Sequence, residues 1–116
     1  MTDEDVLWSA IADPTRRRVL EGVLAHGAAS ASTLAGELPV TRQAIAKHLD
    51  VLGQAGLVVD RKDGRERLWL AEPTRVDEAA QILARVAGDW DRRLAKIKEL
   101  AEAAERAAGQ RDPQGG

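Results

Sequence analysis

The stretch Leu34–Leu70 reads LAGELPVTRQAIAKHLDVLGQAGLVVDRKDGRERLWL, and its apolar residues change spacing at Gly56. Before that glycine they recur every three or four residues, which predicts helix, and after it they alternate, which predicts strand. Pro39 ends one short helix, and Thr41 caps the next helix over Arg42–Ala55. Two helices joined by the tight turn 39–41 and followed by a hairpin form a winged helix-turn-helix.

The rest of the chain is predicted to be helical except at its end. With no Phe or Tyr, the core must come from Leu, Val, Ile and Ala. Cap residues and apolar spacing give a mainly α fold with a two-stranded β-wing. The short helix before Pro39 begins at Ser30 or Ser32 and runs through Leu38. The other expected helices are Asp3–Ala12, Pro14–His26 with Val19, Leu20, Val23 and Leu24 on its core face, and Thr74 to about Ala108. We expect one domain over residues 1–107 and a disordered tail over 108–116.

Asp63-Gly64 predicts a two-residue turn between strands of about Leu57–Lys62 and Arg65–Leu70, which together form the wing. Strand alternation then sorts the side chains onto two faces. Val58 and Trp69 form a cross-strand pair on one face. The face expected to pack on the helices carries Leu57, Val59, Leu68 and Leu70.

Composition excludes several classes of protein. The chain of 116 residues has no room for a second catalytic domain, and without cysteine it has no disulfide framework, thiolate metal site or cysteine nucleophile. We find no nucleophile–base set, phosphate loop or metal cluster, so we expect neither an enzyme nor a cofactor or metal. The N-terminus does not resemble a signal peptide, and no apolar run could span a bilayer, so we expect a cytoplasmic protein without a membrane partner.

The charges are unevenly distributed, although the net charge is −2. Residues 14–70 hold nine basic and six acidic side chains, a balance of +3, whereas residues 1–13 hold four acids and no base. The middle of the chain is therefore the part suited to a polyanion.

On the helix Arg42–Ala55, the polar side chains lie mainly on one side, the polar arc, and the apolar side chains lie on the other. Arg and Lys donate to guanine, Gln pairs with adenine, and a small Ala permits close approach to a base. A solvated surface helix would also carry such an arc, but the neighbouring wing favours DNA binding. The candidate DNA contacts on this helix are Thr41, Arg42, Gln43, Ala46 and Lys47.

The wing supplies the second set of candidate DNA contacts. The predicted turn places Lys62 opposite Arg65, and like charges facing each other on a hairpin are favourable only beside an anion such as a phosphate. Arg61 and Arg67 would face Glu66 and Asp60, so a structural charge pair and a DNA contact are both open for them. Of the run Arg16-Arg17-Arg18, the first faces the core and the other two point outward, so we leave this run out of the site.

The longest helix carries an apolar stripe at intervals of three and four residues, which is typical of a coiled-coil seam. Packing within the chain explains the beginning of the stripe, and dimerisation explains the remainder. The predicted dimer interface combines this C-terminal dimerisation helix with the first helix, through Leu7, Trp8, Ile11, Leu83, Val86, Trp90, Leu94 and Ile97.

Three segments together resemble the ArsR family of bacterial winged-helix repressors: ADPTRRRVL at 12–20, ELPVTRQAIAKHL at 37–49, and Leu52 with AGLV at 55–58. The resemblance covers about residues 3–100. It implies a homodimer on a palindromic operator in double-stranded DNA, repression of a nearby operon, and an inducer, here an unknown small molecule. It also aligns His48 with a histidine common beside the DNA-facing arc, which adds His48 to the candidate DNA contacts, although packing between helices would explain this histidine equally well.

The chain departs from the family's metal sensors, because its third helix has no Cys and its last helix has no His. It therefore resembles the branch without an evident metal site. A different function stays open, in which the winged helix binds another protein through its C-terminal helix and has little DNA specificity.

Overall fold

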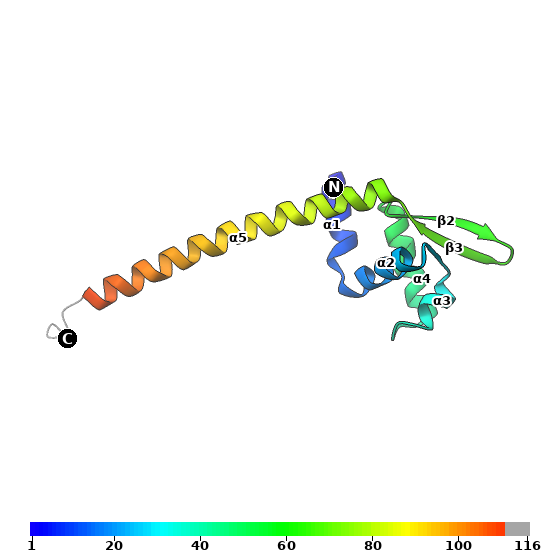
Figure 1. Ribbon diagram of the computed structural model, residues 1–116, viewed down its shortest axis with the longest axis horizontal. Coiled ribbons are helices and arrows are strands. Elements are labelled where there is room, and N and C mark those ends of the chain that lie inside the picture. The colour runs from blue at the N-terminus through cyan, green and yellow to red at the C-terminus, as the bar shows by residue number, and fades with distance from the viewer. Residues whose placement is uncertain (111–116) are drawn as a thin grey trace. The chain divides into compact units, whose positions relative to one another are not determined.

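The computed structural model describes residues 1–110 (Figure 1). In chain order the elements are α1 (Asp3–Ala12), α2 (Pro14–His26), β1 (Ala28–Ala29), α3 (Ala31–Ala35), α4 (Arg42–Gln54), β2 (Val58–Asp63), β3 (Glu66–Ala71) and α5 (Pro73–Gln110). Residues 1–82 form one compact unit, and the part of α5 from Leu83 onward belongs to a second. The mainly helical class with a β-wing and a long C-terminal helix is confirmed. Of the predicted tail, 108–110 continue α5, and 111–116 lie outside the described residues.

Side-chain caps begin the helices where the sequence placed them. Asp13 accepts a hydrogen bond from the backbone N–H of Arg16 at 3.0 Å, and Thr41 accepts one from that of Ala44 at 3.1 Å. Ser30 caps α3 in the same way, through the N–H of Thr33 at 3.1 Å. Each cap satisfies a backbone donor that the first helical turn leaves without a partner. The starts of α2, α3 and α4 are therefore fixed by local sequence.

The core of residues 1–82 lies where α2, α3 and α4 meet. Its largest fully buried side chains are Leu7, Val19, Val23, Leu34, Ile45, Leu49, Leu52, Leu57 and Val58. The predicted core face of α2 is correct for Val19, Leu20 and Val23, but Leu24 is 47% exposed. Gly22 helps α3 approach α2, because a Cβ there would lie 2.6 Å from Cδ2 of Leu34.

Helix α3 ends at Ala35 and not at Leu38, so the predicted three-residue turn before α4 is too short. The N–H of Gly36 bonds to the carbonyls of Ser32 and Thr33, and that of Glu37 bonds to Leu34 O at 3.1 Å. Such tightened bonds close a helix rather than extend it. The connection to α4 therefore runs from Gly36 to Thr41.

Two features of the sheet differ from the prediction. The two-residue strand β1 was not predicted; it pairs antiparallel with β3, so the strand order is β1-β3-β2. The predicted register of the wing, here β2 and β3, is wrong: Asp63 faces Glu66, and Lys62 faces Arg67 instead of Arg65. The turn residues are Gly64 and Arg65. Of residues 63–65 only Gly64 has a positive φ, +62°, whereas a turn at Asp63-Gly64 favours positive φ at both of its residues.

The predicted buried face of the wing is also wrong. Val58 and Trp69 are 1% and 5% exposed and pack inward, while Val59 is 49% exposed. Leu57 is buried but lies before the strand, and Leu68 and Leu70 are half-buried. The cause is a contact distant in sequence: Gly53 of α4 has no side chain, and a Cβ there would lie 3.2 Å from Cζ3 of Trp69.

Candidate nucleic-acid interface

The exposed side of α4 carries the polar arc predicted from the sequence. Ile45, Leu49 and Leu52 are 0% exposed and hold the helix against the core. This packing leaves Thr41, Arg42, Gln43 and Lys47 exposed and Ala46 and His48 half-buried. The first turn and a half of α4 therefore presents donors of the kind that read base edges in a major groove.

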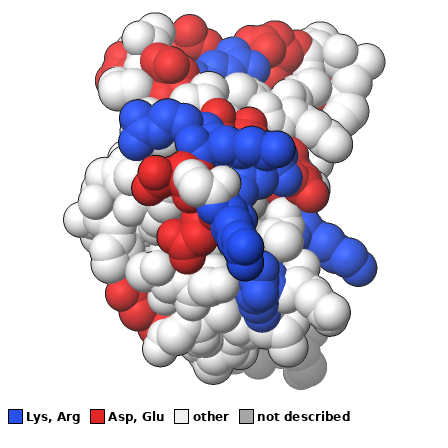
Figure 2. Space-filling view, turned by 90° about the vertical axis from the view of Figure 1, so that its right-hand side faces the viewer, with Lys and Arg blue, Asp and Glu red and all other residues white. Residues whose placement is uncertain are grey.

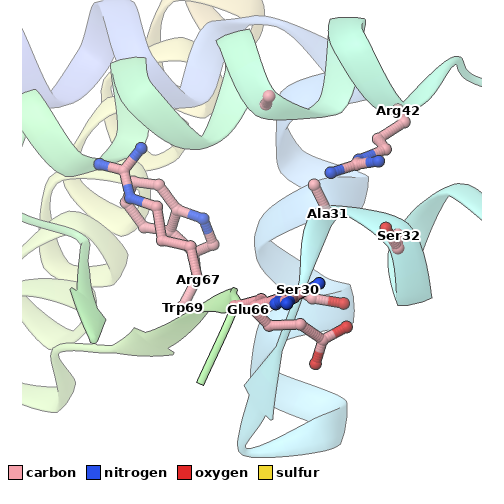
Figure 3. Close-up of a pocket in the computed structure, with 9 residues that line it drawn as sticks. Ser30, Ala31, Ser32, Arg42, Glu66, Arg67 and Trp69 are labelled. Carbon is pink, nitrogen blue, oxygen red and sulfur yellow. The ribbon is translucent and has the colours of Figure 1, made fainter. Parts of the chain in front are cut away.

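An open groove of about 430 Å³ joins this arc to the wing. Arg42 enters it from α4 and Arg67 from β3 (Figure 3). The residues lining it are Ser30, Ala31, Ser32, Arg42, Ala46, Arg65, Glu66, Arg67 and Trp69. The sequence predicted the arginines and Ala46 as site residues but not Ser30, Ser32 and Trp69. Trp69 was missed because the opposite face of the wing, which carries Val59 and Leu68, was expected to be the buried one.

Positive charge gathers on this side of the molecule. Figure 2 looks toward the β2–β3 turn and shows Lys and Arg side chains collected over this face with acidic side chains beside them. Within residues 1–110, no ion pair involves Arg42 or Lys47 of α4 or Lys62 and Arg65 near the wing's turn. These cations keep their hydrogen-bonding capacity for a partner.

Arg67, in contrast, is bound within the fold. Its Nε lies 2.6 Å from Oδ2 of Asp60, its Nη1 lies 3.6 Å from Oδ1 of Asp50, and its guanidinium stacks 4.4 Å from the centre of the Trp69 ring. The hydrogen bond from Arg67 also lowers the pKa of the Asp60 carboxyl. The predicted pairing of Asp60 with Arg67 is therefore present, although the two are diagonal and not direct neighbours.

The companion pair, Arg61 with Glu66, is not formed among the described residues, because Arg61 faces Leu68 and Glu66 faces Asp63. The change of register separates the two side chains along the ladder. Arg61 is exposed on the face of the wing opposite to that of Trp69.

Two arginines at the start of α2 donate hydrogen bonds to the last carbonyls of α1. Arg16 Nη1 donates to Ser9 O at 3.2 Å, as its predicted structural role requires. Arg17 is exposed, as expected, and its Nη1 also donates to Ile11 O at 2.8 Å. The last carbonyls of a helix have no partners within it, and these guanidiniums satisfy them.

The two histidines lie apart. Nε2 of His26 is 2.8 Å from Oε1 of Glu37, so the pair links the end of α2 to the turn before α4. His48 is half-buried on α4, near Asp13, whose pKa is lowered mainly by the hydrogen bond that its carboxyl accepts from the backbone N–H of Arg16. Over residues 1–110 no group of three or more His, Asp or Glu side chains is placed to hold a metal ion.

The residues predicted for a dimer interface differ in exposure. Leu7 and Ile11 are only 1% and 3% exposed, so these two already lie in the core and offer almost no surface to a partner. Trp8 is 42% exposed on α1. On α5, Leu83, Trp90, Leu94 and Ile97 are 38–57% exposed, Val86 is half-buried, and Leu100, which was not predicted, is 59% exposed. None of the helices in residues 1–110 is both long and apolar enough to cross a membrane.

Comparisons with known proteins agree with this geometry. A family model described as a helix-turn-helix domain matches residues 11–61. The HTH-type transcriptional regulator Rv2034 of Mycobacterium tuberculosis is 41% identical over 96 residues, which span 83% of this chain and 86% of that protein.

Solved structures show the same family and fold. An ArsR-like transcriptional regulator from Rhodococcus sp. RHA1 is 42% identical, with a TM-score of 0.62 over 85% of this chain and 92% of that one. The homodimeric winged helix-turn-helix DNA-binding domain Mb0332 of Mycobacterium bovis, a possible ArsR-family regulator, has a TM-score of 0.61 at 23% identity, over 75% of this chain and 79% of that one, and supports the fold alone. The chain belongs to the ArsR family of winged helix-turn-helix, DNA-binding transcriptional regulators.

Proposed function

We propose that the protein is a homodimeric repressor that binds a palindromic operator near the genes it controls. In this proposal Arg42, Gln43 and Lys47 read bases in the major groove, while Lys62 and Arg65 contact the phosphate backbone. The observation that carries the proposal is the groove between α4 and the wing, in which Arg42 and Arg65 are both without an ion-pair partner within residues 1–110.

The exposed arc of α4 supports base reading. Arg42 and Gln43 occupy the first turn of the helix, and the N-terminal residues of a recognition helix are those that reach base edges. Ala46 lies one turn later and is half-buried in the groove, so it allows the helix to approach a base pair closely. Thr41 and His48 flank this set, and in this proposal they form hydrogen bonds with the DNA backbone.

The exposed apolar residues support the dimer. Trp8 and the α5 residues Trp90, Leu94 and Ile97 are each more than two-fifths exposed. A chain gains little by leaving such side chains in water, and a symmetric interface would cover the same set on both copies. One module with few phosphate contacts binds DNA weakly, whereas two recognition helices about one DNA turn apart read both half-sites.

Sequencing genomic fragments retained by the purified protein tests the proposal. We expect one enriched motif with two inverted half-sites, located over or beside a promoter, and in vitro transcription from that promoter should fall when the protein is added. Enrichment without any shared motif would contradict sequence-specific binding. An increase in transcription would contradict repression and leave DNA binding in place.

Loss of one wing cation separates DNA binding from the alternative of protein binding. Lys62→Ala should reduce the slope of log affinity against log salt by about one. A DNA affinity that is weak and has an unchanged slope would instead support a module that docks on another protein.

A further inference from the structure

Arg75, the third residue of α5, joins three elements that are far apart in the sequence. Its Nη1 and Nη2 lie 2.8 Å and 2.6 Å from the two carboxylate oxygens of Asp3, at the start of α1. Its Nε donates to the carbonyl of Ala55, directly after α4, at 2.9 Å. Nη1 also bonds Glu78 of α5 at 2.8 Å. One guanidinium therefore ties the end of the recognition helix to α1 and to the first turns of α5.

The surroundings of Arg75 hold it in this position. Its side chain is only 19% exposed. It lies against the adjoining Gly56, whose φ of +78° turns the chain after α4. Its bonds to Asp3 and then Glu78 raise the pKa of the guanidinium, and the bond from Arg75 lowers the pKa of Asp3. A bidentate arginine–carboxylate pair has a defined geometry, so the link fixes direction as well as distance.

We propose that Arg75 is a positioning residue that sets the half-site spacing accepted by the protein, by fixing α4 relative to α1 and the start of α5. The inference rests on the proposed function above, since spacing has meaning only for a dimer on a palindrome.

Arg75 acts at the end of α4 opposite to the DNA-facing residues. The wing and the polar arc act on DNA at the N-terminal half of the helix, whereas Arg75 holds the carbonyl of Ala55 at the other end. Two recognition helices must lie about one DNA turn apart to enter successive major grooves. If α1 and α5 carry the dimer contacts, the Arg75 link fixes where each recognition helix lies relative to the symmetry axis. Without the link, each helix should tilt more freely and the dimer should tolerate altered operators.

The experiment measures affinity for the enriched operator and for versions with a base pair inserted or removed at its centre. The variants are Arg75→Gln and Asp3→Asn, and Glu78→Gln is the matched control, because it removes a partner within α5 only. We expect the wild type and Glu78→Gln to prefer the natural spacing by about tenfold, and Arg75→Gln to prefer it by about twofold. Asp3→Asn should fall between them, because Arg75 keeps its bond to Ala55.

Affinity for random DNA and dimer mass are measured on the same samples and should not change. If Arg75→Gln fails to fold, Asp3→Asn carries the test, because Asp3 is 72% exposed and its loss leaves the core intact. If Arg75→Gln and Asp3→Asn keep the wild-type spacing preference, the role of Arg75 is overturned and the proposed function stands. If the wild type itself has no spacing preference, the proposed dimer on a palindrome is overturned, and this inference with it.

Discussion

Two groups of charged residues in the wing are bonded differently, although Lys62 of one lies directly opposite Arg67 of the other. The base group is Arg67 with Asp60, Asp50 and Trp69, and the tip group is Lys62 with Arg65. At the base, Arg67 contacts Asp60 and Asp50 and stacks on Trp69. At the tip, Lys62 and Arg65 make no ion pair with any residue in 1–110. The two arginines are two positions apart in sequence, yet one is committed to the fold and the other is available to a partner.

The number of cations in a wing therefore does not give its number of DNA contacts. An arginine with acidic neighbours and an aromatic platform mainly orients the wing on α4, because its Nε already donates to Asp60 and its guanidinium lies over the Trp69 ring. Changes at the base should therefore alter stability, and changes at the tip should alter DNA binding.

The largest expected effect is at the base. Trp69→Ala removes a side chain that is 5% exposed and packs against Gly53, so it should lower the free energy of unfolding by about 3–5 kcal/mol. Urea denaturation at one fixed protein concentration measures this. Val59→Ala, at a site 49% exposed on the other face, is the control and should change stability by less than about 1 kcal/mol. Equal losses would show that the base is not packed as described.

A smaller loss of stability is expected at the turn. Gly64 has φ of +62°, so Gly64→Ala should cost about 1–3 kcal/mol. Gly109→Ala in α5 is the control, because nothing lies within 4 Å of the added Cβ and alanine favours helix. Thermal unfolding followed by circular dichroism compares the two. A Gly64→Ala protein as stable as the wild type would contradict the positive φ of Gly64 in this turn.

Salt dependence of DNA binding sharpens the contrast between the two arginines. Arg65→Ala should reduce the slope of log affinity against log salt by about one, as expected for one lost phosphate contact. Arg67→Ala should leave the slope unchanged while lowering stability slightly, since its donors face Asp60 and Asp50. Equal changes of slope would place both arginines on the DNA backbone.

The smallest expected effect concerns pH. Because Arg67 lowers the pKa of Asp60 below its ordinary value of 3.8, the charged pair adds stability above that pH, and the contribution is lost as the pH falls through the lowered pKa. Asp60→Asn should therefore be less stable than the wild type at about pH 6, and the difference should shrink toward about pH 3. Asp63→Asn at the tip is the control. A difference between wild type and Asp60→Asn that does not vary with pH would contradict the charged pair.

The sequence predicted what local chemistry determines. Caps such as Asp13 and Thr41, and the apolar spacing of Ile45, Leu49 and Leu52, fixed the helices and the exposed arc of α4. These signals depend on neighbours within one or two turns, so they can be read without knowing the rest of the fold.

Several features that the sequence did not predict depend on distant contacts. The buried face of the wing follows from the fit of Trp69 against Gly53, and the link through Arg75 spans 72 positions to Asp3. The strand Ala28–Ala29 forms because β3 offers it a partner, since alanine has little strand preference of its own. No local pattern marks such residues. The hairpin register was wrong because Asp63-Gly64 is a strong turn signal, whereas the strands pair around Gly64 and Arg65.

The central claim, that α4 reads DNA sequence, is tested most directly by the ratio of affinities for the operator and for random DNA. Arg42→Ala and Gln43→Ala should each lower operator affinity by about 1–3 kcal/mol per lost base contact and change random-DNA affinity much less, so the ratio should fall. Equal losses on both DNAs, which leave the ratio unchanged, would contradict base reading by these residues.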